Sequence, residues 1–270
     1  MSILEIIGYL GAIVVGLVLG LLGGGGAAMS IPILVYAFLV PASVATGYSL
    51  LIVGCTALLG TTQNLRKGLI KFNALLYCGI PALIAIYIMR RYLIHLVPDV
   101  FFTIGSYQLT KNSFILLLLA FFMSMVARNM ISPPIQKEGD APPANYTWLL
   151  IQSIFIGLFT GLVGAGGGFL LIPLILSYEQ MEFRNATATS LALVTLNSFI
   201  GFIGDMQSQS KINWVFLFSF VGCSAVGVLF GIALANKIDN KRLRLIFGYV
   251  MLCIALYILV REIFLRLIFQ

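Results

Sequence analysis

The sequence predicts an all-α integral membrane protein made of two homologous repeats. Hydrophobic residues make up 60% of the 270 positions and charged residues only 9%, whereas soluble domains are about 45–50% apolar and about 25% charged. No charged residue stands between Glu5 and Arg66, a stretch about three times as long as the ~20 residues of one membrane-spanning helix. A glycine-rich stretch near the N-terminus also recurs in the second half. Transmembrane β-barrels show short alternating segments rather than long apolar runs, so only helices fit this pattern.

Apolar runs and polar breaks divide the chain into ten segments. The first five lie at residues 3–22, 27–40, 44–62, 72–89 and 112–127, and the other five at 148–163, 168–178, 186–204, 213–235 and 243–260. The stretch between the two sets is rich in proline and mixed charge, which is typical of a linker outside the membrane. We therefore expect a first repeat at 1–128, a linker at 129–146 and a second repeat at 147–270. Glu5 replaces the basic region of a cleaved signal, so the first segment is expected to be a retained helix.

The two halves share one register. Residues 16–32 recur as residues 157–173 without a gap, at a constant offset of 141 positions. The same offset pairs Ala45 with Ala186, Thr46 with Thr187, Ser49 with Ser190 and Asn64 with Asp205. Internal duplication is typical of secondary transporters, which bind substrate near the membrane midplane where the repeats meet.

The basic residues favour inverted repeats with both termini outside. If the first two segments of each repeat form a hairpin, ten of the 16 Lys and Arg residues fall on one side and six on the other. If each pair is instead one broken span, the same residues divide eight to eight. Because cytoplasmic loops carry an excess of Lys and Arg, the hairpin arrangement fits better. Each repeat would then hold one glycine hairpin and three further transmembrane helices.

No polar loop separates the first two segments of either repeat. Only glycine-rich turns do so: the first elbow, residues 23–26, and the second elbow, residues 164–168. Non-helical backbone within a membrane must be buried in protein or line a wet cavity. The short segments that follow would present unpaired backbone N–H groups and the positive end of a helix dipole, which suits an anion. We expect this role for Gly25, Gly26, Gly166 and Gly167, with close packing as the alternative.

For the Gly-x-x-x-Gly pairs that precede the elbows, Gly16 with Gly20 and Gly157 with Gly161, packing is the favoured interpretation.

Polar residues inside the spans complete the candidate site. Hydroxyl groups cluster at the start of the third segment of each repeat, at Thr46, Ser49, Thr187, Thr189 and Ser190. They could line a cavity, or they could bond back to their own helices. Asn64 and Asn197 are further candidates for substrate binding. Asp205 is a candidate for ion coupling, because an ionisable group inside a membrane is a functional hypothesis by default, although it could equally lie in the loop before Lys211.

Other site classes find little support. The formal charge of +7 comes from basic residues scattered between apolar runs, not gathered on a soluble face, so nucleic acid is not an expected partner. Cys55, Cys78, Cys223 and Cys253 lack metal-binding spacing and are expected to be inert thiols. The single histidine, His95, has no partner for catalysis or metal binding. No cofactor and no enzymatic activity are expected.

These motifs resemble the TauE/SafE family of membrane permeases over nearly the whole chain. The resemblance rests on the doubled glycine tract ending at Ile31-Pro32 and Ile172-Pro173, on Ala45-Thr46 and Ala186-Thr187, and on Arg66-Lys67-Gly68. It implies secondary transport of a small anion, such as sulfite or the organosulfonate sulfoacetate, across a prokaryotic-type plasma membrane, with proton or cation coupling possible. Ala165 departs from the symmetry, because the first repeat has Gly24 there. A non-transporting scaffold subunit and an intramembrane enzyme are the alternatives.

Overall fold

A computed structural model describes residues 3–98, 100–104, 107–132, 146–179, 181–206 and 212–265. The first half contains α1 (Ile3–Leu22), α2 (Gly25–Tyr36), α3 (Ala42–Arg66), α4 (Phe72–Arg91), the 3-10 turn η1 (Leu93–His95), β1 (Val100–Ile104), β2 (Tyr107–Thr110) and α5 (Lys111–Ile131). The second half contains α6 (Tyr146–Val163), α7 (Gly168–Glu179), α8 (Phe183–Met206), α9 (Trp214–Ala235), α10 (Asn240–Leu259) and the π-helical turn η2 (Val260–Leu265). The prediction of a helical membrane protein is confirmed, and seven of these helices are long and apolar enough to cross a membrane.

Two local features differ from the sequence prediction. An antiparallel hairpin of β1 and β2 stands between α4 and α5, where no strand was expected; Val100–Ile104 is made of β-branched and aromatic residues that favour strands. Helix α5 continues to Ile131 and so includes the first residues of the predicted linker. Residues 133–145 of that linker lie outside the described residues. The boundaries of the two repeats stay a prediction.

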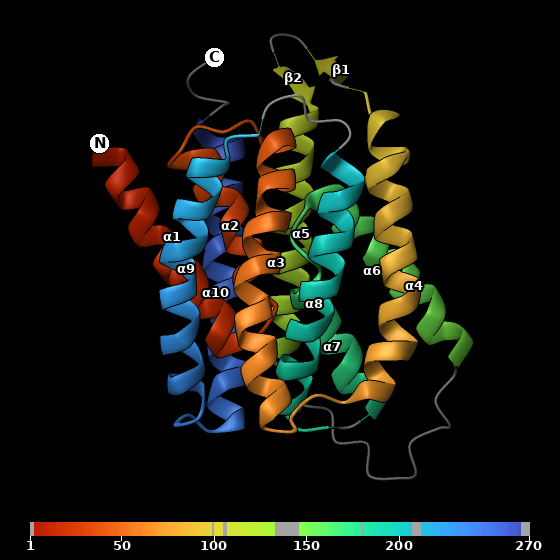
Figure 1. Cartoon of the computed structure of the whole chain (residues 1–270). Coiled ribbons are helices and arrows are strands. Elements are labelled where there is room, and N and C mark those ends of the chain that lie inside the picture. Colours follow the sequence, from red (N-terminus) through yellow and green to blue (C-terminus); the bar gives the residue numbers. More distant parts are fainter. Residues whose placement is uncertain are drawn as a thin grey trace.

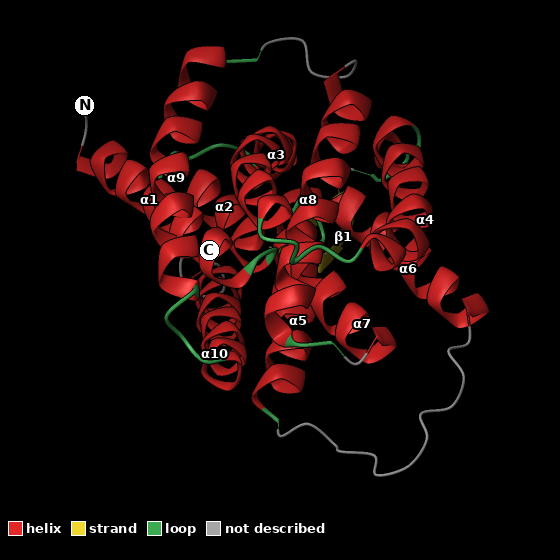
Figure 2. Cartoon of the chain, turned by 60° about the horizontal axis from the view of Figure 1, so that its bottom comes forward, coloured by secondary structure: helices red, strands yellow, loops and turns green. Residues whose placement is uncertain are grey.

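The helices form one bundle in which the two halves pack across each other. Helix α1 packs along α9, and its counterpart α6 packs along α4; α3 packs against α8, and α5 against α10. Figure 1 shows that α3 and α8 run in opposite directions and that both ends of the chain lie at the same end of the bundle. Figure 2 shows α3 and α8 in the middle, with α1 and α6 toward opposite edges. We call the end with the chain termini the terminal end and the opposite end the linker end.

Small residues permit the close crossings at both edges. A Cβ atom on Gly16 would overlap the backbone carbonyl of Ser224 in α9, and one on Gly157 would lie 2.6 Å from the carbonyl oxygen of Ala82 in α4. Such backbone proximity is the expected use of Gly-x-x-x-Gly in membrane helices. The packing role predicted for these glycines is confirmed.

Candidate functional site

The two glycine elbows lie in the interior of the bundle and touch each other. All residues of both elbows are buried. A Cβ atom on Gly24 would overlap Gly168 Cα, and a Cβ atom on Gly168 would overlap Gly24 Cα. Helices α2 and α7 begin at this contact and have 12 residues each, a length of about 18 Å. They are therefore shorter than the ~30 Å hydrocarbon core of a bilayer.

The second elbow is the more unwound of the two. Gly164, Gly166 and Gly167 have φ values of 80°, 63° and 77°, in the left-handed region that favours glycine. In the first elbow only Gly23 has a positive φ. Gly25 and Gly26 instead form the first turn of α2, where a Cβ on Gly25 would meet the Phe247 ring at 2.5 Å. Gly25 is therefore packed against apolar side chains, whereas Gly166 and Gly167 form an irregular turn.

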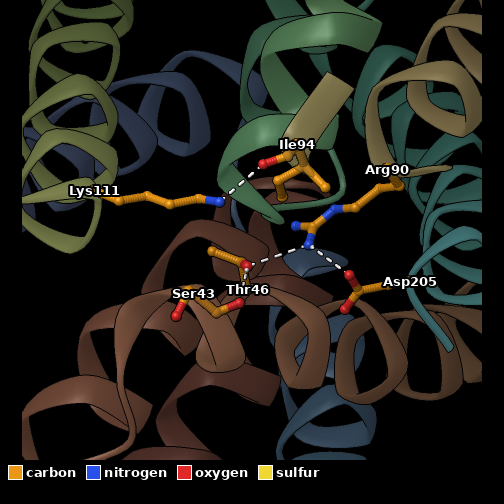
Figure 3. Close-up of polar contacts among 6 residues, drawn as sticks. All are labelled: Ser43, Thr46, Arg90, Ile94, Lys111 and Asp205. Atoms are coloured by element: carbon orange, nitrogen blue, oxygen red, sulfur yellow. Dashed lines mark hydrogen bonds and ion pairs between the residues drawn. The ribbon is translucent and has the colours of Figure 1, made fainter. Parts of the chain in front are cut away.

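Arg90 reaches this second elbow from the last turn of α4. Its side chain is 0% exposed. Its Nη1 atom donates a hydrogen bond of 3.2 Å to Thr46 Oγ1 and lies 3.5 Å from Asp205 Oδ1 (Figure 3). Its Nη2 atom lies 2.6 Å from the position that a Cβ on Gly164 would take. The guanidinium group thus joins α3, α4, α8 and the second elbow.

The Arg90 guanidinium keeps unused donors. Within the described part of the chain, neither Nε nor Nη2 has a hydrogen-bond partner, although both atoms are buried. A buried donor without a partner costs about 1–3 kcal/mol, and more when it is charged. Lys111 adds a second cation near this group and donates to the Ile94 carbonyl oxygen at 2.8 Å. Figure 3 shows its amine directed toward the same region. The arrangement is suited to an additional anionic or hydrogen-bond-accepting group.

The residues that correspond to the Arg90 site in the other repeat lie beside the first elbow and line a small cavity. The offset of 141 takes Arg90 to Gly231, Asp205 to Asn64, Thr46 to Thr187 and Ile94 to Ala235. Asn64 and Thr187 line a cavity of about 20 Å³ together with Gly23 and Arg184, enough for about one water molecule. Arg184 donates to the Ala235 carbonyl oxygen at 2.7 Å, in the same way as Lys111 does to Ile94. The molecule therefore contains two related polar sites: the Arg90 site at the terminal end, which is closely packed, and the Asn64 site at the linker end, which includes the small cavity.

The other predicted hydroxyl groups fasten helices together or bond to their own helices. Ser49 Oγ lies 2.5 Å from Ser30 Oγ of α2, and Ser190 donates to the Gly168 carbonyl oxygen of α7 at 2.9 Å. These two matched residues thus hold the short helices against α3 and α8. Three threonines donate to a carbonyl of their own helix: Thr46 to Ser43, Thr187 to Arg184 and Thr189 to Asn185.

A second group of polar atoms contacts the second elbow. The Asn197 amide nitrogen lies 3.5 Å from the Gly166 carbonyl oxygen, and Asn197 Oδ1 has no partner among the described residues. Ser198 Oγ and Thr160 Oγ1, also without described partners, lie 2.7 Å and 2.6 Å from the Cβ positions of Gly166 and Gly167. The offset matches Thr160 and Ser198 with Leu19 and Ala57. Polar lining is thus concentrated on the second elbow.

Sequence reasoning misjudged Arg90 and left Asp205 open. Arg90 was interpreted as a charge that orients a span end, but it is completely buried. Asp205 lies inside α8 and is 6% exposed, so the loop alternative for this residue is wrong. The signal for Arg90 was Asp205 itself, since a carboxylate at membrane depth needs a cationic partner. No group of three metal-binding side chains occurs in the ranges described above.

Comparison with known proteins decides the family. The family described as Sulfite exporter TauE/SafE matches residues 9–258. The chain belongs to this family. Related TauE/SafE-like sequences include a probable membrane transporter protein of Xylella fastidiosa, 25% identical over 259 residues and covering 92% of both chains. The probable membrane transporter protein YunE of Bacillus subtilis is 26% identical over 285 residues and covers 93% of this chain and 97% of its own.

A third relative is archaeal. A probable membrane transporter protein of Methanocaldococcus jannaschii is 23% identical over 265 residues, covering 92% of this chain and 94% of its own. No solved structure shows a significant match. The family, its members and the seven long apolar helices identify this TauE/SafE chain as a multi-pass membrane protein of a transporter family.

Proposed function

We propose that this chain is a secondary transporter that moves a small anion across the plasma membrane by alternating access between two inverted repeats. The substrate class we propose is sulfite, which the family description names, or an organosulfonate such as sulfoacetate. The observation that carries the proposal is Arg90, a fully buried guanidinium beside an unwound glycine elbow, two of whose nitrogen atoms have no hydrogen-bond partner among the described residues.

The chemistry around Arg90 favours an oxyanion. The planar guanidinium matches carboxylate-like and phosphate-like oxygens with paired hydrogen bonds. Sulfite and sulfonate present the same kind of oxygen pair. Lys111 increases the positive charge near the site, and Gly166 and Gly167 have no side chains of their own that would shield their backbone N–H groups. The anion would bind between Arg90 and the second elbow, with Thr46 and Asn197 as polar neighbours.

The relation of the two halves supports alternating access. Helices α3 and α8 run in opposite directions, and each edge helix of one half packs on the other half. The Arg90 site and the Asn64 site lie toward opposite ends of the bundle, because Asp205 and Asn64 stand near the C-terminal ends of two antiparallel helices. The side chains of the Arg90 site are buried, whereas the Asn64 site contains a cavity of about 20 Å³. During transport, the cavity at the Asn64 site would close and the Arg90 site would open toward the opposite end of the bundle.

Asp205 supplies a mechanism for proton coupling. When ionised, the Asp205 carboxylate forms an ion pair with Arg90 Nη1. It therefore competes with a substrate anion for the guanidinium group. Protonation of Asp205 would weaken that competition, so an anion would bind together with a proton. Arg90 and Lys111 are the cations that Figure 3 shows around this site, and Arg91 follows Arg90 at the end of α4.

Flux measurements in liposomes test this function. The purified protein should carry sulfite or sulfoacetate down a gradient, and Arg90→Gln should abolish this flux while Arg91→Gln retains most of it. Both variants should be monodisperse in detergent, which separates loss of transport from loss of folding. Absence of flux for every sulfur oxyanion and sulfonate with well-folded protein, or normal flux in Arg90→Gln, would contradict the proposal.

A further inference from the structure

A groove separate from the Arg90 and Asn64 sites opens on the side of the bundle. It lies between α1, α2 and α10 and has a volume of about 500 Å³, within the ~300–1,000 Å³ that is common for small-molecule sites. Its walls include Ile7 and Gly11 of α1, Met29 and Ile33 of α2, and Cys253 and Ile254 of α10. Ile7 is 55% exposed. Because α1 lies at the edge of the bundle (Figure 2), this groove faces the surrounding bilayer.

The groove has the length of one membrane leaflet. Its α2 wall extends from Met29 to Ala37, about 12 Å along a helix axis. Half of a ~30 Å hydrocarbon core is about 15 Å. The groove ends near Tyr36, Tyr257 and Arg261, at the terminal end of the bundle. An apolar channel of this length that ends in a cation has the dimensions of an acyl chain joined to a charged head group.

Arg261 is held rigidly at the end of the groove. It stands in the π-helical turn η2 that follows α10, and its guanidinium carbon lies 4.1 Å from the centre of the Tyr36 ring. Its Nη1 atom donates to Tyr257 Oη at 3.1 Å, which uses one of the five donors of a guanidinium. The Tyr36 hydroxyl donates to Glu262 Oε1 at 3.2 Å. Glu262 is 3% exposed, so it orients Tyr36 from inside the protein while Arg261 stays accessible.

We propose that this groove binds an anionic phospholipid, with one acyl chain between α1, α2 and α10 and the phosphate on Arg261. A guanidinium binds the oxygens of a phosphate group through paired, charge-assisted hydrogen bonds. Here the tyrosine rings pre-order the guanidinium, which lowers the entropy cost of binding. The site is separate from Arg90 and does not depend on the transport proposal.

Native mass spectrometry of the full-length protein tests the site with phosphatidylglycerol and phosphatidylcholine of identical acyl chains. Wild type should bind phosphatidylglycerol about fivefold more tightly, the effect of about one basic residue near the surface. Arg261→Gln should lose this preference. Arg91→Gln is the matched control, because Arg91 also lies over a tyrosine ring, that of Tyr92 at 5.9 Å, at the terminal end and outside the groove. It should keep the preference.

A second variant separates the tail from the head group. Cys253 lines the groove and is exposed, so Cys253→Phe should reduce binding of both lipids, while Cys253→Ser should not. Millimolar inorganic phosphate should not displace the lipid, because the acyl chain supplies much of the contact. Equal binding of the two lipids by wild type, unchanged preference in Arg261→Gln, displacement by phosphate alone, or a groove occupied by a second copy of the chain would each overturn the proposal.

Discussion

Arg90 Nη1 lies 3.5 Å from Asp205 Oδ1, and neither side chain is more than 8% exposed. The two residues come from α4 and α8, so the pair joins the two halves of the chain at the terminal end. Burial removes the hydration of both charges, and their mutual attraction compensates for only part of this loss. A pair retained under such conditions is better explained by function than by stability.

The pair should show strong coupling in a double-mutant cycle. Arg90→Gln or Asp205→Asn alone leaves one buried charge without its partner and should destabilise the protein by about 3–5 kcal/mol. The double variant should lose less than the sum of the two, since it buries no charge. Unfolding in detergent by a thermal or denaturant series measures these differences. Strictly additive losses would mean that the two charges do not interact.

Asp205 should determine the pH dependence of transport. In the proposed mechanism, protonation of Asp205 releases Arg90 for the anion, so the flux of wild type should rise as external pH falls. Asp205→Asn removes the titrating group and should give a flux that varies little with pH. Liposome flux at a series of pH values, with a substrate that keeps the same charge over that range, measures this. A variant that keeps the wild-type pH profile would refute the coupling role.

Gly164 should tolerate no side chain, although another left-handed glycine should. At φ 80°, a Cβ on Gly164 would meet Arg90 Nη2 at 2.6 Å and overlap Thr46. Gly68 has a similar φ of 67°, but no atom of the described residues lies within 4 Å of its Cβ position. Gly68→Ala should therefore cost only the backbone term of about 1–2 kcal/mol. Gly164→Ala should cost more and also reduce anion binding, which thermal unfolding with and without substrate distinguishes.

Two glycines of helices α1 and α9 should likewise differ in whether they tolerate a side chain. Gly16→Leu would force the two backbones apart, because its Cβ would overlap the Ser224 carbonyl. Overpacking of this kind typically costs about 1–3 kcal/mol and often more at a backbone contact. Among the residues that the structure describes, none has an atom within 4 Å of the Cβ position of Gly222 in α9, so Gly222→Leu is the control. Comparable yields of monodisperse protein for the two variants would argue against this packing.

The sequence predicted helices better than contacts. The expected segment 44–62 became α3 (Ala42–Arg66), because the helix continues through polar, partly exposed residues such as Asn64 at its end. The repeat register also indicated in advance that the two elbows would be related. What periodicity could not supply was the partner of Asp205, because Arg90 lies 115 positions away and only tertiary packing brings the two together. The β1–β2 hairpin lies between the expected segments 72–89 and 112–127, in a stretch for which the sequence analysis predicted no element.

Thermal stability of the purified protein against a panel of small anions tests the central claim most directly. The panel holds sulfite, sulfate, thiosulfate, sulfoacetate, taurine and several carboxylates, each measured with wild type and Arg90→Gln. A ligand at 100 times its Kd stabilises a protein by about 2.7 kcal/mol, so a selective rise in the melting temperature with sulfite or a sulfonate is expected for wild type and not for Arg90→Gln. A flat panel for wild type, or an equal rise in Arg90→Gln, would contradict an anion site at Arg90.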